Sequence, residues 1–83
     1  MKIQVLGTGC AKCKKLFSET EKAVTQAGVP ASIEKVEKLD EIMAFGVMMT
    51  PALVIDGVVK ASGRIPRISE ITTWISAAAA REG

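Results

Sequence analysis

Cys10 and Cys13 are the two cysteines of this 83-residue chain, and they lie in the stretch GTGCAKCKK, residues 7 to 15. Two intervening residues place the thiols about one helical turn apart, close to the roughly 5.5 Å Cα separation that a disulfide prefers. Such a pair can exchange electrons by opening and closing a disulfide, bind a soft metal ion such as Cu(I), or serve as two small buried apolar side chains. The third interpretation is the weakest, because Gly-Thr-Gly before Cys10 favours an exposed thiol.

The expected position of Cys10, at the start of a helix, favours a reactive thiolate. Unpaired backbone N–H groups and the helix dipole stabilise negative charge there, and Lys12 and Lys14 add positive charge nearby. Cys13 lies on the predicted inner face of the helix beside Leu16, where burial should keep its thiol protonated. The pattern therefore predicts an attacking thiol at residue 10 and a thiol suited to resolve a mixed disulfide at residue 13.

The elements that position these thiols follow from the periodicity of apolar residues. Residues 2–6 (KIQVL) alternate polar and apolar side chains, which predicts a strand, and apolar residues recur at helical spacing from Ala11 to about Ala27. The further predicted elements are a strand within residues 29–37, a helix over residues 39–45, strands over residues 52–55 and 58–62 around the turn Asp56-Gly57, and a closing helix within residues 64–82 with Pro66 near its start.

The predicted order β-α-β-α-β-β-α specifies an α/β fold with a mixed four-stranded sheet and helices on both faces. A helical crossover makes the first two strands parallel, and the Asp-Gly hairpin makes the last two strands antiparallel. A chain of 83 residues without an internal repeat or linker suits a single domain, residues 1–83.

The composition argues against several classes of function. A net charge of +2 with mixed signs along the chain gives no sign of nucleic-acid binding. Histidine is absent, which removes Cys-His nucleophilic catalysis and zinc sites that need imidazole, and two cysteines alone cannot complete a structural zinc site. No apolar run is long enough for a membrane span or a signal peptide, so we expect a cytoplasmic protein that does not bind membranes.

Thr50-Pro51, directly before an apolar strand, distinguishes between electron exchange and metal transfer. Small metal-carrier domains with a similar Cys-x-x-Cys loop run β-α-β-β-α-β, whereas this chain has a helix after its second strand and ends on a helix. GCAKC together with MTPALVIDG resembles the thioredoxin-like family, in which the Cys-x-x-Cys loop faces a cis-proline loop. The likeness is greatest to the small glutaredoxin-sized redox-active disulfide proteins of that family, with the pattern GxGCxxC…GVxxTPALVIDGxVxxxG, and it covers essentially the whole chain.

The resemblance implies a thiol-disulfide oxidoreductase that needs no cofactor and acts in electron transport and cell redox homeostasis. It makes Cys10 the attacking thiol and Cys13 the resolving thiol. It also makes Pro51 a cis-proline and gives Thr50 a backbone that pairs with a bound polypeptide, as in strand addition. The implied partners are a disulfide-containing protein substrate and an electron donor resembling thioredoxin reductase, and we expect a monomer. The predicted substrate-binding residues are Gly9, Met49, Thr50 and Pro51.

The sequence departs from the thioredoxin pattern at two places. Gly9 and Ala11-Lys12 replace the aromatic residue and the proline of the WCGPC loop, and no Asp or Glu lies on the first strand or the inner face of the helix, where the family's buried acid would lie. The acceptor of the Cys13 proton is therefore not identified from the sequence. A Cu(I)-type carrier using the same two thiols stays as the alternative function, and an interaction module with unused thiols as a third.

Residues 47–49 (VMM) admit two interpretations. They could form an apolar rim that docks partner proteins, a use that suits flexible methionine, or they could pack against the sheet. The lysines at positions 12, 14 and 15 similarly either tune the thiolate or form a solvated helix face, and the second interpretation is favoured.

Overall fold

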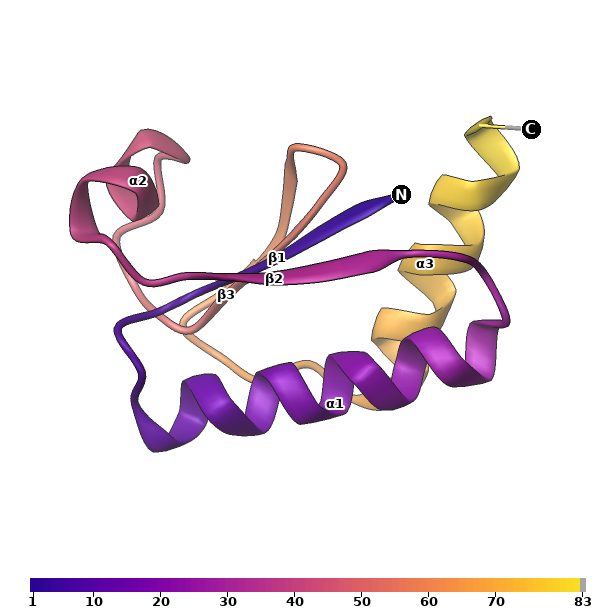
Figure 1. The fold of residues 1–83 in the computed structure, drawn as a ribbon, viewed down its shortest axis with the longest axis horizontal. Helices are drawn as coiled ribbons and strands as arrows, with labels where there is room; N and C mark the ends of the chain where they lie inside the picture. The colour runs from indigo at the N-terminus through magenta and orange to yellow at the C-terminus, as the bar shows by residue number, and fades with distance from the viewer. Residues whose placement is uncertain (83) are drawn as a thin grey trace.

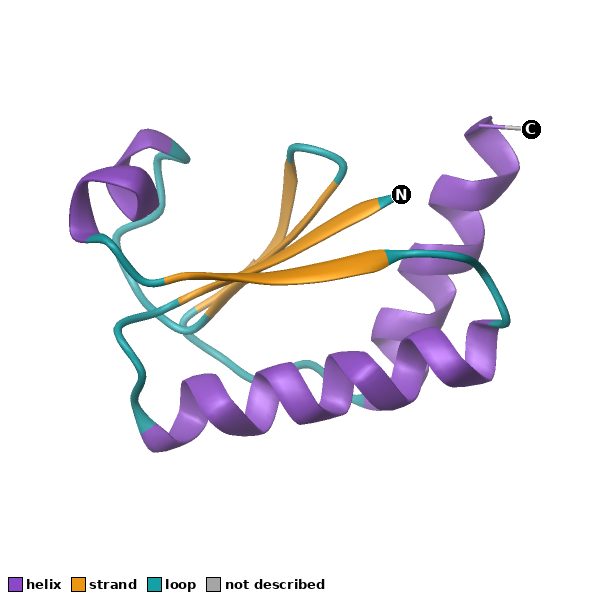
Figure 2. Cartoon of the chain, in the orientation of Figure 1, coloured by secondary structure: helices purple, strands orange, loops and turns teal. Residues whose placement is uncertain are grey.

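The computed structural model describes residues 1–82. Its elements, shown in Figure 1 and coloured by type in Figure 2, are β1 (Lys2–Leu6), α1 (Ala11–Ala27), β2 (Ser32–Val36), α2 (Leu39–Ala44), β3 (Ala52–Ile55), β4 (Val58–Ser62) and α3 (Ile68–Glu82). The predicted order β-α-β-α-β-β-α is confirmed. The closing helix begins at Ile68, so Pro66 lies just before its start, close to the predicted position.

The four strands form one mixed sheet with the order β2-β1-β3-β4. β1 runs parallel to β2 and antiparallel to β3, and β3 and β4 form the predicted antiparallel hairpin. Both residues of its turn, Asp56 and Gly57, have positive φ, as two-residue turns that match the twist of a hairpin require. This order makes β1 and β3 the central strands and leaves β2 at one edge.

Helices cover both faces of the sheet, as predicted. Figure 1 shows α1 and α3 on one side of the strands and α2 on the other. The larger core cluster lies on the side of α1 and α3 and consists of Ile3, Val5, Leu16, Ala23, Leu53, Ile55, Ile71, Ile75 and Ala78. The smaller cluster lies on the side of α2 and consists of Leu6, Val36, Ile42, Ala52 and Val54. Alternation along β1 sends Ile3 and Val5 to one cluster and Leu6 to the other, because successive strand residues point to opposite faces.

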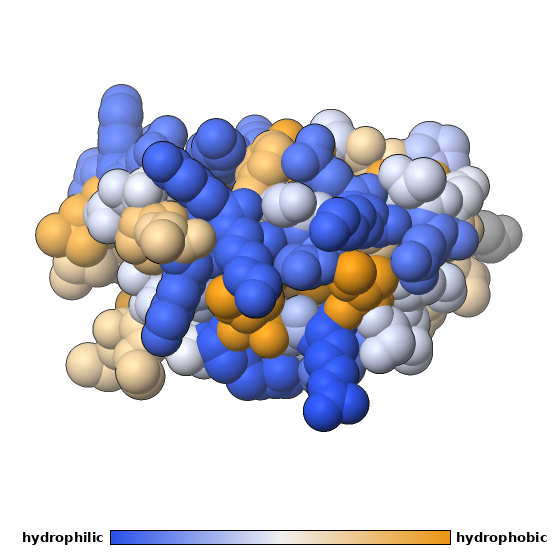
Figure 3. All heavy atoms as spheres, turned by 90° about the horizontal axis from the view of Figure 1, so that it is seen from below, coloured by the Kyte–Doolittle hydropathy of each residue, from blue (hydrophilic) through white to orange (hydrophobic). Residues whose placement is uncertain are grey.

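The outer surface of α1 is mainly polar. Figure 3, seen from below Figure 1, shows long hydrophilic side chains over this face with small separate hydrophobic patches between them. The buried hydroxyl of Thr20, on the inner face of α1, donates to the carbonyl oxygen of Leu16 at 2.7 Å. Among residues 1–82, no helix is both long and apolar enough to cross a membrane.

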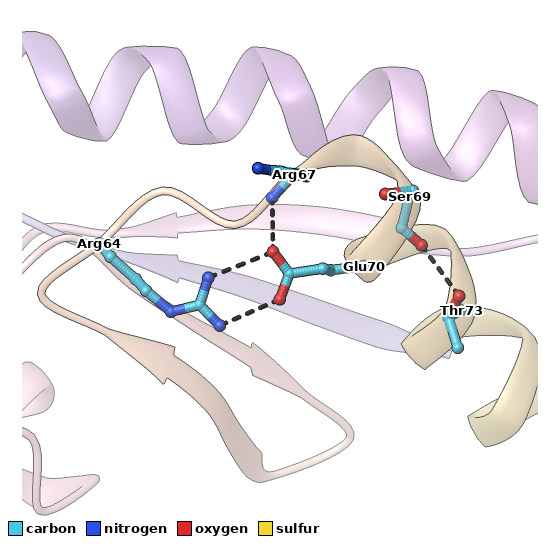
Figure 4. Close-up of polar contacts among 5 residues, drawn as sticks. All are labelled: Arg64, Arg67, Ser69, Glu70 and Thr73. Atoms are coloured by element: carbon cyan, nitrogen blue, oxygen red, sulfur yellow. Dashed lines mark hydrogen bonds and ion pairs between the residues drawn. The ribbon is translucent and has the colours of Figure 1, made fainter.

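Glu70 secures the start of α3. Arg64 donates from Nη1 and Nη2 to the two carboxylate oxygens of Glu70 at 3.3 and 3.1 Å, and the backbone N–H of Arg67 donates to Oε1 at 3.1 Å (Figure 4). The contact with Arg67 is one half of a capping box, in which the third helical residue reaches back to the residue before the helix. The hydrogen bond from Arg64, followed by the one from the Arg67 backbone, lowers the pKa of Glu70 below its ordinary value of 4.5.

We predict that Glu70→Gln removes a pH-dependent contribution to stability. Because the folded state lowers the pKa of Glu70, the ionised group stabilises the fold fully above the pKa of the unfolded chain, and this contribution is lost as pH falls through the lower folded pKa. Urea unfolding should show a lower midpoint for the variant at pH 7 and a difference that disappears in acid. The difference should be modest, because the ion pair is in contact with solvent.

Glu21→Gln is the matched control, because Glu21 lies exposed on α1 and away from this contact. Its midpoint should follow that of the wild type at both pH values. A Glu70→Gln midpoint that stays below the wild type by the same amount at every pH would contradict the assigned role of the charge.

Candidate active site

Cys10 is exposed and forms the N-cap of α1. Its Sγ accepts a hydrogen bond from the backbone N–H of Cys13 at 3.2 Å, and its carbonyl oxygen accepts the N–H of Lys14 at 3.0 Å. The first bond uses an N–H group that has no partner within the helix, and such groups stabilise a thiolate. The structure therefore places the Cys10 sulfur where a negative charge is favoured.

Cys13 lies one turn into the helix, and its side chain is only 6% exposed. It forms a disulfide with Cys10, with the two Cα atoms 5.1 Å apart. The two sulfurs therefore differ in accessibility, although they belong to one turn of one helix. Cys10 is thus open to solvent and Cys13 is not, and the burial of Cys13 agrees with its predicted position on the inner face of the helix.

Gly7 is the point at which the thiol pair meets the Thr50-Pro51 loop. A Cβ atom on residue 7 would lie 3.0 Å from Cys13 Cβ, nearer still to Cys13 Sγ, and 4.0 Å from Thr50 Cβ. The N–H of Gly7 also donates to the carbonyl oxygen of Val36 at 2.9 Å, which continues the β1–β2 pairing beyond the strand end. The missing side chain thus lets Cys13 pack directly on the backbone that leads to Cys10.

The peptide bond between Thr50 and Pro51 is cis, as the resemblance implied. Pro51 is buried, whereas Thr50 is exposed. The Pro51 carbonyl oxygen accepts the backbone N–H of Gly63 at 2.9 Å. Gly63 has a φ of +74° and packs against Met49, since a Cβ on residue 63 would lie 3.1 Å from the Met49 Cβ. The end of β4 therefore supports this loop from the side away from the thiols.

A methionine groove lies beside the loop on the α2 side. It has a volume of about 410 Å³ and is lined by Thr8, Leu39, Ile42, Met43, Val47, Met48 and Thr50. Met48 is 97% exposed, and Met43 and Met49 are each 64% exposed, whereas Val47 packs against the smaller core cluster. Val47 therefore packs inward, as the second interpretation held, and Met48 and Met49 lie on the surface, where docking of a partner stays a prediction.

A second, much smaller cavity of about 50 Å³ adjoins Cys13 on the β2 side. Its walls are formed by Val5, Gly7, Gly9, Cys13, Lys14, Lys35 and Glu37. Glu37 approaches the cysteine loop closely, since a Cβ on Gly9 would lie 3.4 Å from Glu37 Oε2. The Lys35 ammonium lies 5.0 Å from the centre of the Phe17 ring, a cation–π distance. Lys12, Lys14 and Lys15 are all exposed, as a solvated helix face requires.

Sequence reasoning missed Lys35 and Glu37. The signal was present in the parallel pairing of β1 and β2, which aligns Leu6 with Val36 and so places residue 37 beside the turn after β1. A search confined to the first strand and the helix could not find an acid that comes from the neighbouring strand. Within residues 1–82, no cluster of three or more His, Cys, Asp or Glu side chains is arranged to hold a metal ion.

Comparison with known proteins gives one family. The family model described as a thioredoxin domain matches residues 1–76, a range that includes both cysteines and the Thr50-Pro51 loop. The chain is 40% identical over 76 residues to the thioredoxin of Methanothermobacter thermautotrophicus, which covers 92% of this chain and 99% of the relative. It is 39% identical over 69 residues to the thioredoxin of Methanocaldococcus jannaschii, which covers 83% of this chain and 79% of that relative.

We predict that Gly7→Ala disrupts the thiol pair. The added Cβ overlaps the Cys13 side chain, so either the sulfur or the turn must move, at a cost of about 1–3 kcal/mol of folding free energy. Urea unfolding measures this loss, and titration with a glutathione redox buffer should show a smaller fraction of Cys10–Cys13 disulfide than in the wild type. Gly28→Ala is the control, because residue 28 has a positive φ but no atom near its absent Cβ. It should lower stability without changing the disulfide fraction, and an equal change in both variants would contradict the role given to Gly7.

Proposed function

Because the chain belongs to the thioredoxin family, we propose that it is a thiol-disulfide oxidoreductase whose Cys10 and Cys13 alternate between dithiol and disulfide. The observation that carries the proposal is the asymmetry of the pair. Cys10 is exposed with its sulfur at the N-terminus of α1, and Cys13 is buried one turn further on, within disulfide distance. These are the properties that an attacking and a resolving thiol need.

The proposed reaction has two exchange steps. The Cys10 thiolate attacks one sulfur of a substrate disulfide and forms a mixed disulfide, and the other substrate sulfur leaves as a thiolate. Cys13 then loses its proton and attacks the Cys10 sulfur, which forms the Cys10–Cys13 disulfide and releases the second substrate thiolate. The substrate gains two electrons and the enzyme loses two. A dithiol electron donor resembling thioredoxin reductase returns the pair to the reduced state.

The proposed substrate is a protein, bound in an extended conformation across Thr50-Pro51. The exposed Thr50 offers backbone hydrogen bonds to an added strand, and Gly9 and Met49 flank the thiols and the loop. The methionine groove lies beside the loop and exposes the kind of flexible apolar surface on which different partners can dock. We propose that a single domain acts as a monomer in the cytoplasm, where protein disulfides are transient and catalytic.

We predict that Cys10→Ser abolishes disulfide reductase activity and that Cys13→Ser stops it at the mixed disulfide. Turnover of insulin disulfides with dithiothreitol as donor should fall to the rate of dithiothreitol alone in the Cys10 variant. Mass spectrometry of the Cys13 variant after reaction with oxidised glutathione should show one stably attached glutathione. The wild type should lose that adduct by forming its own disulfide.

Two results would contradict the proposal. Full reductase activity in Cys10→Ser would show that the pair does not carry the electrons. Alternatively, a tight stoichiometric Cu(I) complex of the reduced wild type, together with no reductase activity, would assign the thiols to metal transfer.

We predict that Met48→Ser weakens the use of protein substrates only. Met48 is almost fully exposed at the methionine groove, and losing about 1 kcal/mol of apolar contact with a docked chain should raise KM for insulin about fivefold. The rate with the small disulfide DTNB should not change, because that reagent needs only the thiol. Val58→Ser, an exposed apolar change at the β3–β4 hairpin, serves as the control. An equal effect of both substitutions, or no effect of either, would argue against docking at the groove.

A further inference from the structure

The small cavity beside Cys13 contains one group that can accept a proton. Its charged side chains are Lys14 from α1 and Lys35 and Glu37 from β2 and the residue after it, and the β1 side contributes only Val5, Gly7 and Gly9. Ammonium groups are donors without an acceptor site, whereas an ionised carboxylate is an acceptor only. Glu37 is therefore the proton acceptor among the side chains that line this cavity.

Cys13 needs such an acceptor if it resolves the mixed disulfide. Its thiol must lose a proton before it attacks, and burial of the side chain at 6% exposure disfavours the thiolate. The cavity of about 50 Å³ exceeds the roughly 15 Å³ that a water molecule requires, and although its walls are mainly apolar, the Glu37 carboxylate and the Lys14 and Lys35 ammonium groups offer such a molecule polar partners. A water molecule can therefore connect the thiol with the carboxylate.

Building on the proposed function, we infer that Glu37 accepts the Cys13 proton, through water, in the resolving step. The Cys13 S–H bond breaks and its electron pair stays on sulfur as the proton moves to the Glu37 carboxylate. The thiolate then attacks Cys10 Sγ, the new S–S bond forms, and the bond to the substrate sulfur breaks. The substrate leaves as a thiolate, which takes up a proton from solvent. Lys14 and Lys35 face the same cavity and favour the negative charge that forms on Cys13.

The Lys35 ammonium makes a cation–π contact with the Phe17 ring. The ring belongs to the same helix as Cys13, and Lys35 also lines the cavity. The carboxylate and the ammonium groups then have different roles: Glu37 takes the proton, and the lysines stabilise the resulting thiolate. This assignment supplies the acid that is missing from the first strand.

Stopped-flow reaction of the reduced protein with DTNB separates the two thiols. Attack by Cys10 releases one thionitrobenzoate, and attack by Cys13 on the resulting mixed disulfide releases the second. We expect Glu37→Gln to slow the second release about tenfold near pH 7 and to leave the first release unslowed. The deficit should shrink as pH approaches about 8.5, where a thiol ionises without help. Glu37→Asp should restore part of the rate, and Glu41→Gln, the same loss of charge on α2, should match the wild type.

The sign of the effect separates proton transfer from simple electrostatics. If Glu37 acted only as a nearby negative charge, its removal would favour both thiolates and speed both releases. A second release that is unchanged or faster in Glu37→Gln would therefore overturn the inference while leaving the proposed function intact. A wild-type protein that releases the first thionitrobenzoate but never the second would overturn the proposed function and this inference together.

Discussion

The close approach of Cys13 to Gly7 is the constraint on which the site depends. Because residue 7 has no side chain, the first turn of α1 can pack against the chain that leaves β1, and the Thr50 side chain comes to the same point from the other side. The turn after β1 and the first turn of α1 therefore lie beside Thr50, which comes from a distant part of the sequence. A larger residue would separate the buried thiol from the loop that precedes β3, and the accessible sulfur of Cys10 would lose its fixed relation to both.

The remainder of the fold keeps these segments in position. β1 is a central strand, paired with β2 on one side and β3 on the other. The segment after β1, which carries the cysteines, and the segment before β3, which carries Thr50-Pro51, therefore leave the sheet from adjacent strands. α1 packs its inner face on the larger core cluster, which fixes the helix axis and hence the position of its first turn. The backbone N–H of Gly63 donates a hydrogen bond to the Pro51 carbonyl oxygen, which connects the loop to the end of β4. None of these contacts uses the Cys10 side chain, which suits a site where that sulfur must stay free to react.

Local patterns predicted the elements well because each of them carries its own signal. Alternation marked β1, helical spacing marked α1, and Asp56-Gly57 marked the hairpin. The resemblance carried by the Cys-x-x-Cys loop and Thr50-Pro51 placed these two segments together, and in the structure Cys13 and Thr50 both lie beside Gly7. Local patterns did not identify Glu37 and Lys35, because their proximity to Cys13 arises from the pairing of β1 with β2, two strands that are about thirty residues apart. Residues 47–49 have similar hydrophobicity, so the sequence could not show which of them is buried. Tertiary packing places Val47 against the smaller core cluster and leaves Met48 and Met49 exposed.

The two thiols have different chemistry because the helix begins between them. The N–H of Cys13 that contacts Cys10 Sγ favours charge on the outer sulfur, whereas the inner sulfur lies in a small cavity with a carboxylate and two ammonium groups. In the proposed cycle an electron donor also attacks Cys10, because only Cys10 is exposed, and Cys13 is then the leaving group. In the oxidising direction Cys13 loses its proton, and in the reducing direction it regains one. By microscopic reversibility, a group that accepts the proton in one direction returns it in the other. The same cavity would then act in both halves of the cycle. The reduction potential of the pair would therefore depend as much on the surroundings of the Cys13 sulfur as on the exposed Cys10 thiolate.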